Sequence, residues 1–176
     1  MRAALAVVLA LAALAAGAAQ DAHRILETED DAFSYIVRTH PADAHLMDVS
    51  APAAPDSALN TAKLLNRHLS AGDIEEAALL SNEPKRRFVV FREFRDAIGE
   101  EEFKRIFARY FFPENRLVAE VLIPPHSLLI WRLAEERHLA GQFFVQVENR
   151  WLMDDVPSET RTRLRHVLER YRKEDR

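Results

Sequence analysis

The chain contains no cysteine, no Asn-x-Ser/Thr sequon and no apolar run long enough to cross a membrane. Without cysteine there is no disulfide, no thiol nucleophile, no thiolate metal site and no lipid-bearing cysteine after a leader. The longest apolar run, residues 3–16, covers about 14 residues, whereas a membrane-spanning helix needs about 20. A hydrophobic core must therefore stabilise the fold without covalent cross-links.

The first nineteen residues predict a secretory signal peptide. Arg2 precedes the apolar run, which ends in the small residues Ala16-Gly17-Ala18-Ala19. A basic start, a short apolar segment and a small-residue exit are the three parts of such a leader. We therefore expect a secreted protein that begins near Gln20, and the missing cysteines and sequons favour a bacterial periplasm.

The charge balance is mildly acidic. The 24 basic and 28 acidic side chains give a net charge of −4, and removal of Arg2 with the leader leaves −5. This balance argues against a nucleic-acid binder and against contact with an anionic membrane. The roughly 157 residues after the leader form one domain, which can bury about 70% of its unfolded surface.

Residues 20–56 differ in composition from the rest and predict an acidic N-terminal arm that ends in a linker. Residues 20–57 hold eight acidic side chains against Arg24 and Arg38, and residues 50–55 are a Ser/Ala/Pro segment. Phe33, Tyr35 and Val37 alternate with smaller or polar neighbours, which indicates a short strand. We expect a loosely attached arm with one docked segment.

Residues 57–156 predict a domain in which helices come first and strands follow. Asp56 or Ser57 can cap a helix that Gly72 ends, and three further helices follow up to Tyr110. After Pro113 the apolar period changes from helical to alternating, and this change predicts four strands. The predicted strands cover residues 117–123, 129–133, 143–147 and 151–153, with a tight turn at 148–150.

Residues 157–176 predict a basic amphipathic helix with an apolar stripe at Leu164, Val167, Leu168 and Tyr171. A run of helices followed by a run of antiparallel strands is typical of an α+β fold. The fold class we predict is α+β: N-terminal helices packed on a curved antiparallel sheet, with the C-terminal helix added. The basic side chains of this helix ordinarily form a solvent-exposed face.

The order of these elements resembles the nuclear transport factor two-like superfamily. Two segments carry the resemblance, residues 70–77 (SAGDIEEA) at a helix end and residues 145–154 (VQVENRWLMD) in the last hairpin. The resemblance covers about residues 57–156 and implies a cone, with a curved antiparallel sheet wrapped around helices. The family includes isomerases, dehydratases, ligand binders and association domains, so it does not select a function.

The expected ligand pocket is the interior of this cone. We predict that Tyr110, Trp131, Phe143 and His126 form its wall, without a catalytic residue and without a cofactor. Alternation places Glu120 on the strand face opposite Ala119 and Val121. The leading interpretation is a non-catalytic binding module for a small apolar ligand; the alternative is an isomerase or hydrolase with His126 or a rearranged carboxylate as base.

Two further predictions concern a metal and a partner. His40, Asp43, His45 and Asp48 are weak metal-ligand candidates, because their spacing matches no defined motif. The second strand faces are apolar, which indicates that the arm or a second copy of the chain covers them. We therefore expect a homodimer, with packing within one chain as the simpler alternative. Its interface would use Val118, Leu122, Leu128, Ile130 and Phe144.

Overall fold

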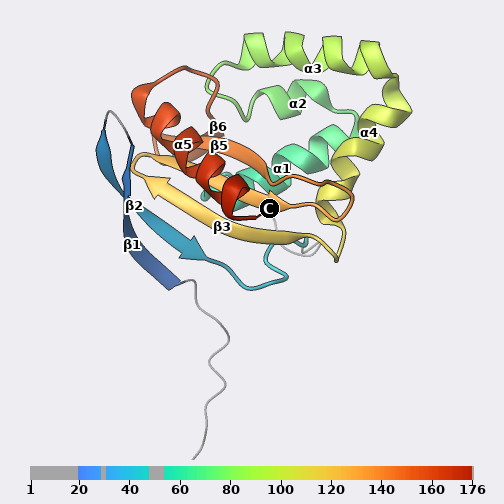
Figure 1. The fold of residues 1–176 in the computed structure, drawn as a ribbon. Coiled ribbons are helices and arrows are strands. Elements are labelled where there is room, and N and C mark those ends of the chain that lie inside the picture. The colour runs from blue at the N-terminus through green and yellow to red at the C-terminus, as the bar shows by residue number, and fades with distance from the viewer. Residues whose placement is uncertain (1–19, 29–30, 48–53, 176) are drawn as a thin grey trace, which may run out of the picture.

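The computed structural model describes residues 20–28, 31–47 and 54–175, which form an α+β fold with one six-stranded antiparallel sheet (Figure 1). The predicted signal peptide, Asp48 and most of the predicted linker lie outside these residues. Each strand pairs with the next one along the chain. The strands are β1 (Gln20–Glu27), β2 (Ala32–Thr39), β3 (Arg116–Ile123), β4 (His126–Arg132), β5 (Ala140–Val147) and β6 (Arg150–Met153).

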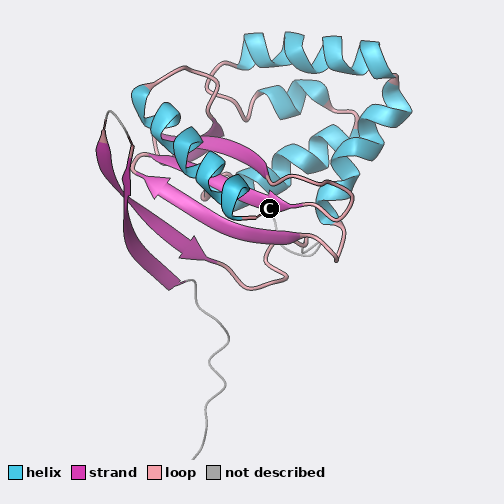
Figure 2. Ribbon diagram, viewed as in Figure 1, coloured by secondary structure: helices cyan, strands magenta, loops and turns pink. Residues whose placement is uncertain are grey.

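Five α-helices complete the described fold (Figure 2): α1 (Ala58–Ala71), α2 (Ile74–Ala78), α3 (Pro84–Ile98), α4 (Glu100–Ala108) and α5 (Glu159–Glu174). The predicted signals set several boundaries. The Ser57 hydroxyl accepts a hydrogen bond from the Asn60 backbone N–H, and Gly72 ends α1 with a φ of 86°. None of the described helices is long and apolar enough to span a membrane.

Helices cover both faces of the sheet (Figure 1). On one face, α1 packs on Leu117, Leu129, Trp131 and Phe144, with α2, α3 and α4 stacked beyond it. On the other face, Leu164, Val167 and Leu168 of α5 pack on aliphatic side chains of β3 and β4. We call these the α1 face and the α5 face. A sheet covered in this way needs apolar residues at successive strand positions rather than at alternate ones.

The arm predicted for residues 20–56 is in part the edge of the same sheet. Strands β1 and β2 form a hairpin, and β2 joins β3 through the pairs Ile36–Leu122, Val37–Val121 and Arg38–Glu120. Phe33, Tyr35 and Val37 are buried in the core under α5. The alternating apolar side chains explain this attachment, because they continue the α5 face outward.

The residues predicted for a dimer interface are mostly buried within one chain, and the homodimer itself stays a prediction. Leu128 and Ile130 lie beneath α5, and Val118 packs partly buried against the same core. Leu122 and Phe144 lie on the opposite face, as their pairing with Ser127 shows. The C-terminal helix covers Val118, Leu128 and Ile130, which are one part of the surface that the sequence interpretation assigned to the arm or to a second copy.

Candidate functional site

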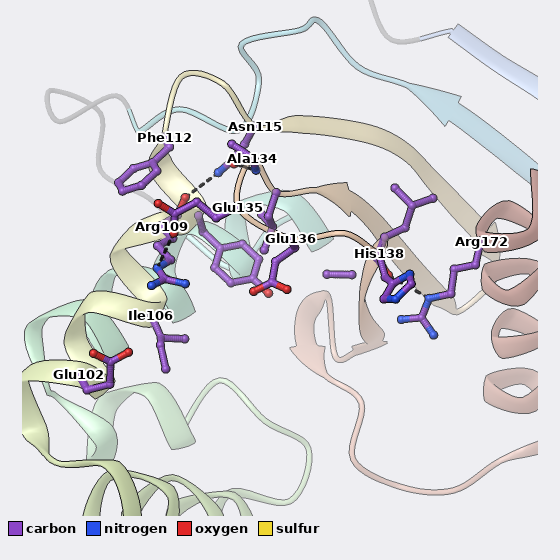
Figure 3. Close-up of a pocket in the computed structure, with 14 residues that line it drawn as sticks. Glu102, Ile106, Arg109, Phe112, Asn115, Ala134, Glu135, Glu136, His138 and Arg172 are labelled. Atoms are coloured by element: carbon purple, nitrogen blue, oxygen red, sulfur yellow. Dashed lines mark hydrogen bonds and ion pairs between the residues drawn. The ribbon is translucent and has the colours of Figure 1, made fainter. Parts of the chain in front are cut away.

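A groove of about 420 Å³ lies between α4 with its following 3₁₀ turn η1 (Arg109–Phe111) and the connection from β4 to β5 (Figure 3). Ile106, Tyr110, Phe112 and Leu133 supply its apolar lining. Three glutamates in the first turn of α4, at the positive end of the helix dipole, favour the helix that forms one wall. The groove thus combines an apolar surface with a polar rim.

Asn115 joins the two walls of the groove. Its side-chain amide donates a hydrogen bond of 2.6 Å to the Arg109 carbonyl, and its side-chain oxygen accepts one of 3.0 Å from the Ala134 backbone N–H. Asn115 is buried, so both bonds are shielded from water. The sequence gives no pattern that singles out this asparagine, because its two partners lie on different elements.

Tyr110 is the residue with the most distinctive chemistry in the groove. Its ring packs edge-on against Trp131, with 5.7 Å between ring centroids. Burial, with a smaller contribution from the Glu136 carboxylate, raises the pKa of Tyr110 to about 12. The hydroxyl is therefore neutral at physiological pH, and it has no hydrogen-bond partner among the described residues, so it can donate to a ligand.

Charged side chains at the rim are held in place by their own partners. Arg109 pairs with Glu135 at 3.2 Å, and Arg172 donates to the Leu139 carbonyl at 2.9 Å. Figure 3 shows these two arginines at opposite ends of the groove. Glu136 and His138 also line it, so the rim presents both signs of charge around the apolar lining.

Of the four residues predicted to share one pocket wall, the structure brings together Tyr110 and Trp131, and it places Phe143 and His126 elsewhere. Tyr110 lines the groove, whereas Trp131 is buried below it and donates from Nε1 to the Gln142 side-chain oxygen at 2.9 Å. Phe143 faces the α5 side, because it pairs with Leu128 rather than Leu129. His126 lies at the other end of β4, with its Nδ1 atom 3.1 Å from an oxygen of Asp154.

The predicted metal candidates also separate. His40 contacts Glu120, while His45 is buried against Trp131 with its Nε2 atom 3.0 Å from the Phe112 carbonyl oxygen. Asp43 is exposed in a turn, and Asp48 lies outside the described residues. Within the part of the chain that the structure describes, no group of three such side chains could hold a metal ion.

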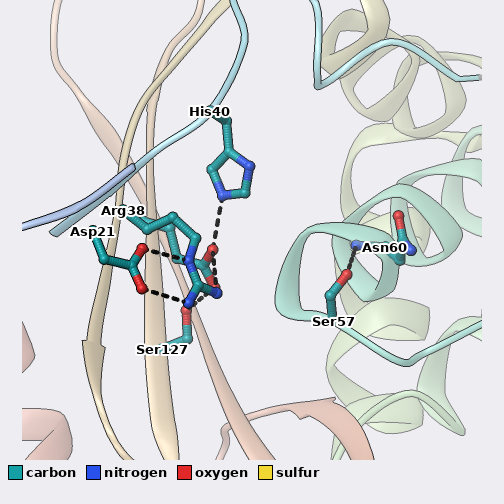
Figure 4. Close-up of polar contacts among 7 residues, drawn as sticks. Asp21, Arg38, His40, Ser57, Asn60 and Ser127 are labelled. Carbon is teal, nitrogen blue, oxygen red and sulfur yellow. Dashed lines mark hydrogen bonds and ion pairs between the residues drawn. The ribbon is translucent and has the colours of Figure 1, made fainter. Parts of the chain in front are cut away.

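A buried carboxylate that the sequence interpretation did not place in the core lies where β2, β3 and β4 meet (Figure 4). Glu120 is only 4% exposed, on the strand face opposite Ala119. His40 Nε2 lies 2.8 Å from one of its oxygens, and Ser127 donates to the other at 2.9 Å. The predicted face was right, but that face is not solvent-exposed.

Arg38 connects this cluster to the outer strand. Its guanidinium lies 3.8 Å from Glu120 and donates two hydrogen bonds, of 2.8 and 2.9 Å, to the Asp21 carboxylate. Hydrogen bonding to Arg38 lowers the pKa of Asp21, and the same contact raises the pKa of Arg38. Each polar side chain of the cluster has a hydrogen-bond or ion-pair partner within the cluster. The cluster therefore connects neighbouring strands.

A second polar cluster connects the helical layer to the end of β6. Asp155 accepts hydrogen bonds from the Ser81 hydroxyl at 2.6 Å and from two nitrogens of Arg87. Burial and the neighbouring positive charges of Arg161 and Arg86 lower the pKa of Arg87. Asp154, the other acid of the cluster, is shared by Asn82 and His126.

Comparison with known proteins finds no match for this chain among protein-family models, curated proteins or solved structures.

Proposed function

We propose that this chain is a secreted, periplasmic, non-catalytic binding module that takes a small, largely apolar ligand in the groove beside Tyr110. The observation that carries the proposal is the Tyr110 hydroxyl, a neutral donor at an apolar surface of the groove that has no hydrogen-bond partner within the described part of the chain. Ligand sites typically combine apolar walls with a few placed polar groups. The ligand class that fits has an apolar body and one hydrogen-bond acceptor.

The proposed ligand site lies in a surface groove, whereas the sequence interpretation placed it in the interior of the cone. Trp131, Phe144 and Leu129 are buried between the sheet and α1, where the sequence interpretation expected an open interior. We further propose a nuclear transport factor two-like cone for residues 57–156. The order of four helices followed by the β3–β6 meander supports it.

A non-catalytic role is supported by how the polar groups are used. Covalent catalysis needs a nucleophile bonded to a base, which a third group orients. Among the described residues, Ser127 donates to Glu120 and Ser81 to Asp155, and Arg87 already neutralises Asp155. No described serine or threonine hydroxyl is bonded to a histidine, so the clusters stabilise the fold.

Native mass spectrometry of protein purified from the periplasm without denaturation tests the groove proposal. We expect a discrete extra mass on the wild type and its loss in Ala134→Trp, because Ala134 is an exposed groove residue that an indole would fill. Ala97→Trp, the same substitution on the exposed surface of α3, should keep the mass. An empty wild type, or an Ala134→Trp variant that still carries the mass, would refute the proposal.

One observation favours a second function, a small-molecule isomerase or hydrolase. Asp154 contacts the Nδ1 atom of His126, which leaves Nε2 available as a general base. Hydrolysis of a panel of chromogenic esters by the wild type and by His126→Gln tests it. A rate that falls at least tenfold in the variant would favour the enzyme, and equal rates would exclude His126 as its base.

A further inference from the structure

A second cavity, of about 210 Å³, lies at the β6 edge of the sheet beside the early turns of α3 and α5. It is smaller than the roughly 300 Å³ at which sites for drug-sized ligands begin, yet larger than the roughly 30 Å³ that one water occupies. Arg87, Gln142, Phe143, Met153 and Arg161 line it, together with Asp154 and Asp155. Its size suits a small organic ion.

Arg161 is the unusual member of this lining. Its backbone N–H donates to the capping hydroxyl of Ser158, which fixes the residue in the first turn of α5. Its guanidinium lies over the Phe143 ring, 5.4 Å from the centroid, and its Nε atom is buried without a hydrogen-bond partner. A buried donor left unpaired costs stability, so this group calls for an acceptor.

The cavity lining carries two arginines and two aspartates, and neither aspartate forms an ion pair with Arg161. Asp155 already pairs with Arg87, and Asp154 is held by Asn82 and His126, so neither carboxylate neutralises Arg161. The two guanidinium groups are close enough that Arg161 lowers the pKa of Arg87. Arg87 uses its Nε and Nη2 atoms to bond Asp155, and it lines the same cavity as Arg161.

We propose that this cavity binds the carboxylate of a small organic monoanion, at a site separate from the groove beside Tyr110. Arg161 supplies a planar pair of donors, which matches the two oxygens of a carboxylate. Phe143 and Met153 contact the short apolar part of the ligand. A phosphate dianion fits less well, because Asp154 and Asp155 would repel its second charge.

Titration of full-length protein with sodium butyrate at constant ionic strength, followed by ¹⁵N NMR, tests this site. We expect saturable shifts at the Gly141 amide and the Arg161 Nε–H, with a Kd of about 1 mM for so small a ligand. Arg161→Gln should weaken binding by about tenfold or more, since it removes a charge-assisted bond. Arg165→Gln, an exposed arginine on the same helix that does not line the cavity, should bind like the wild type.

Three results would overturn the proposal: shifts that do not saturate, Arg161→Gln binding as tightly as the wild type, or inorganic phosphate binding more tightly than butyrate. If Arg161→Gln does not fold, Arg161→Lys decides the question, because it keeps the charge and the aliphatic stem but loses the planar donor pair. We expect severalfold weaker butyrate binding for Arg161→Lys, and unchanged binding would refute the carboxylate geometry.

Discussion

The two buried faces of the sheet are built from different side chains. The centre of the α5 face is aliphatic, with Val121, Leu128 and Ile130 packed against α5, and aromatic residues such as Phe33 and Tyr35 lie toward its β2 edge. The α1 face mixes large aromatic residues with buried polar ones, of which Glu120 and Ser127 are the clearest. Both faces are buried to a similar degree, so burial alone does not show which of them contains polar side chains.

The contrast also locates the open sites. On the α1 face every polar side chain of the Glu120 cluster is bonded to another, so its chemistry is used within the fold. Two groups without a partner among the described residues, the Tyr110 hydroxyl and the Arg161 Nε atom, lie where helices end or begin. Substitutions on each face can therefore compare how much apolar packing and polar contacts contribute to the free energy of unfolding.

The largest effect is expected on the aliphatic face. Leu128→Ala removes a fully buried side chain under α5, and we expect the free energy of unfolding to fall by about 3 kcal/mol. Leu79→Ala makes the same change at a leucine that is 57% exposed, and should cost no more than about 0.5 kcal/mol. Urea unfolding of both variants measures the difference. Similar costs would mean that α5 does not form a tight core with the sheet.

A pH-dependent effect is expected beside the α1 face. The pKa of Tyr110 is about 12 in the folded protein and about 10 in the unfolded chain, so the unfolded state loses its proton first. Stability is therefore intact below pH 10 and falls as the pH rises toward 12, by about 2 kcal/mol from this group.

Tyr110→Phe should remove that pH dependence, which unfolding measured at several pH values will show. Tyr171→Phe provides the comparison from α5: burial raises the pKa of Tyr171 too, but this side chain is less buried, so a smaller change is expected. Identical alkaline slopes for the wild type and Tyr110→Phe would show that the hydroxyl ionises as freely when folded as when unfolded.

The smallest effect is expected at the buried carboxylate. Glu120→Gln removes a charge but keeps the size, and both Arg38 and His40 have ways to remain satisfied: Arg38 keeps Asp21, and the glutamine amide can still hydrogen-bond His40. We expect a loss of about 1 kcal/mol. A double-mutant cycle of Glu120→Ala with Ser127→Ala measures the coupling of the two side chains, because each change removes their hydrogen bond, and a coupling free energy of zero would contradict that bond.

Local signals predicted the elements well. Ser57 and Ser158 cap their helices with side-chain hydrogen bonds, and Gly72 ends α1 in a left-handed conformation. The predicted tight turn between the last two strands contains Glu148 and Asn149, both with positive φ, as a two-residue hairpin turn requires. These features depend on neighbours within a few residues, so a single sequence specifies them.

The relation between strands could not be predicted in the same way. Alternation divides the residues of each strand between two faces. It does not show which face of one strand lies on the same side of the sheet as a given face of the next; the pairing of Phe143 with Leu128 shows this for β4 and β5. Glu120 and His40 are 80 residues apart in sequence, so nothing local links them. The groove depends on Asn115 bridging two elements, and the missing partner of Arg161 is visible only when its whole surroundings are known.

The short ladder between β2 and β3 has a consequence for the order of folding. Strands β3 to β6 form a local meander, whereas Ile36 meets Leu122 only after a long intervening segment has been brought together. Loop-closure entropy delays such a contact, so we expect the meander and its helices to assemble first. The hairpin at Gln20–Thr39 then docks last and is the first unit to detach in partial opening of the native protein.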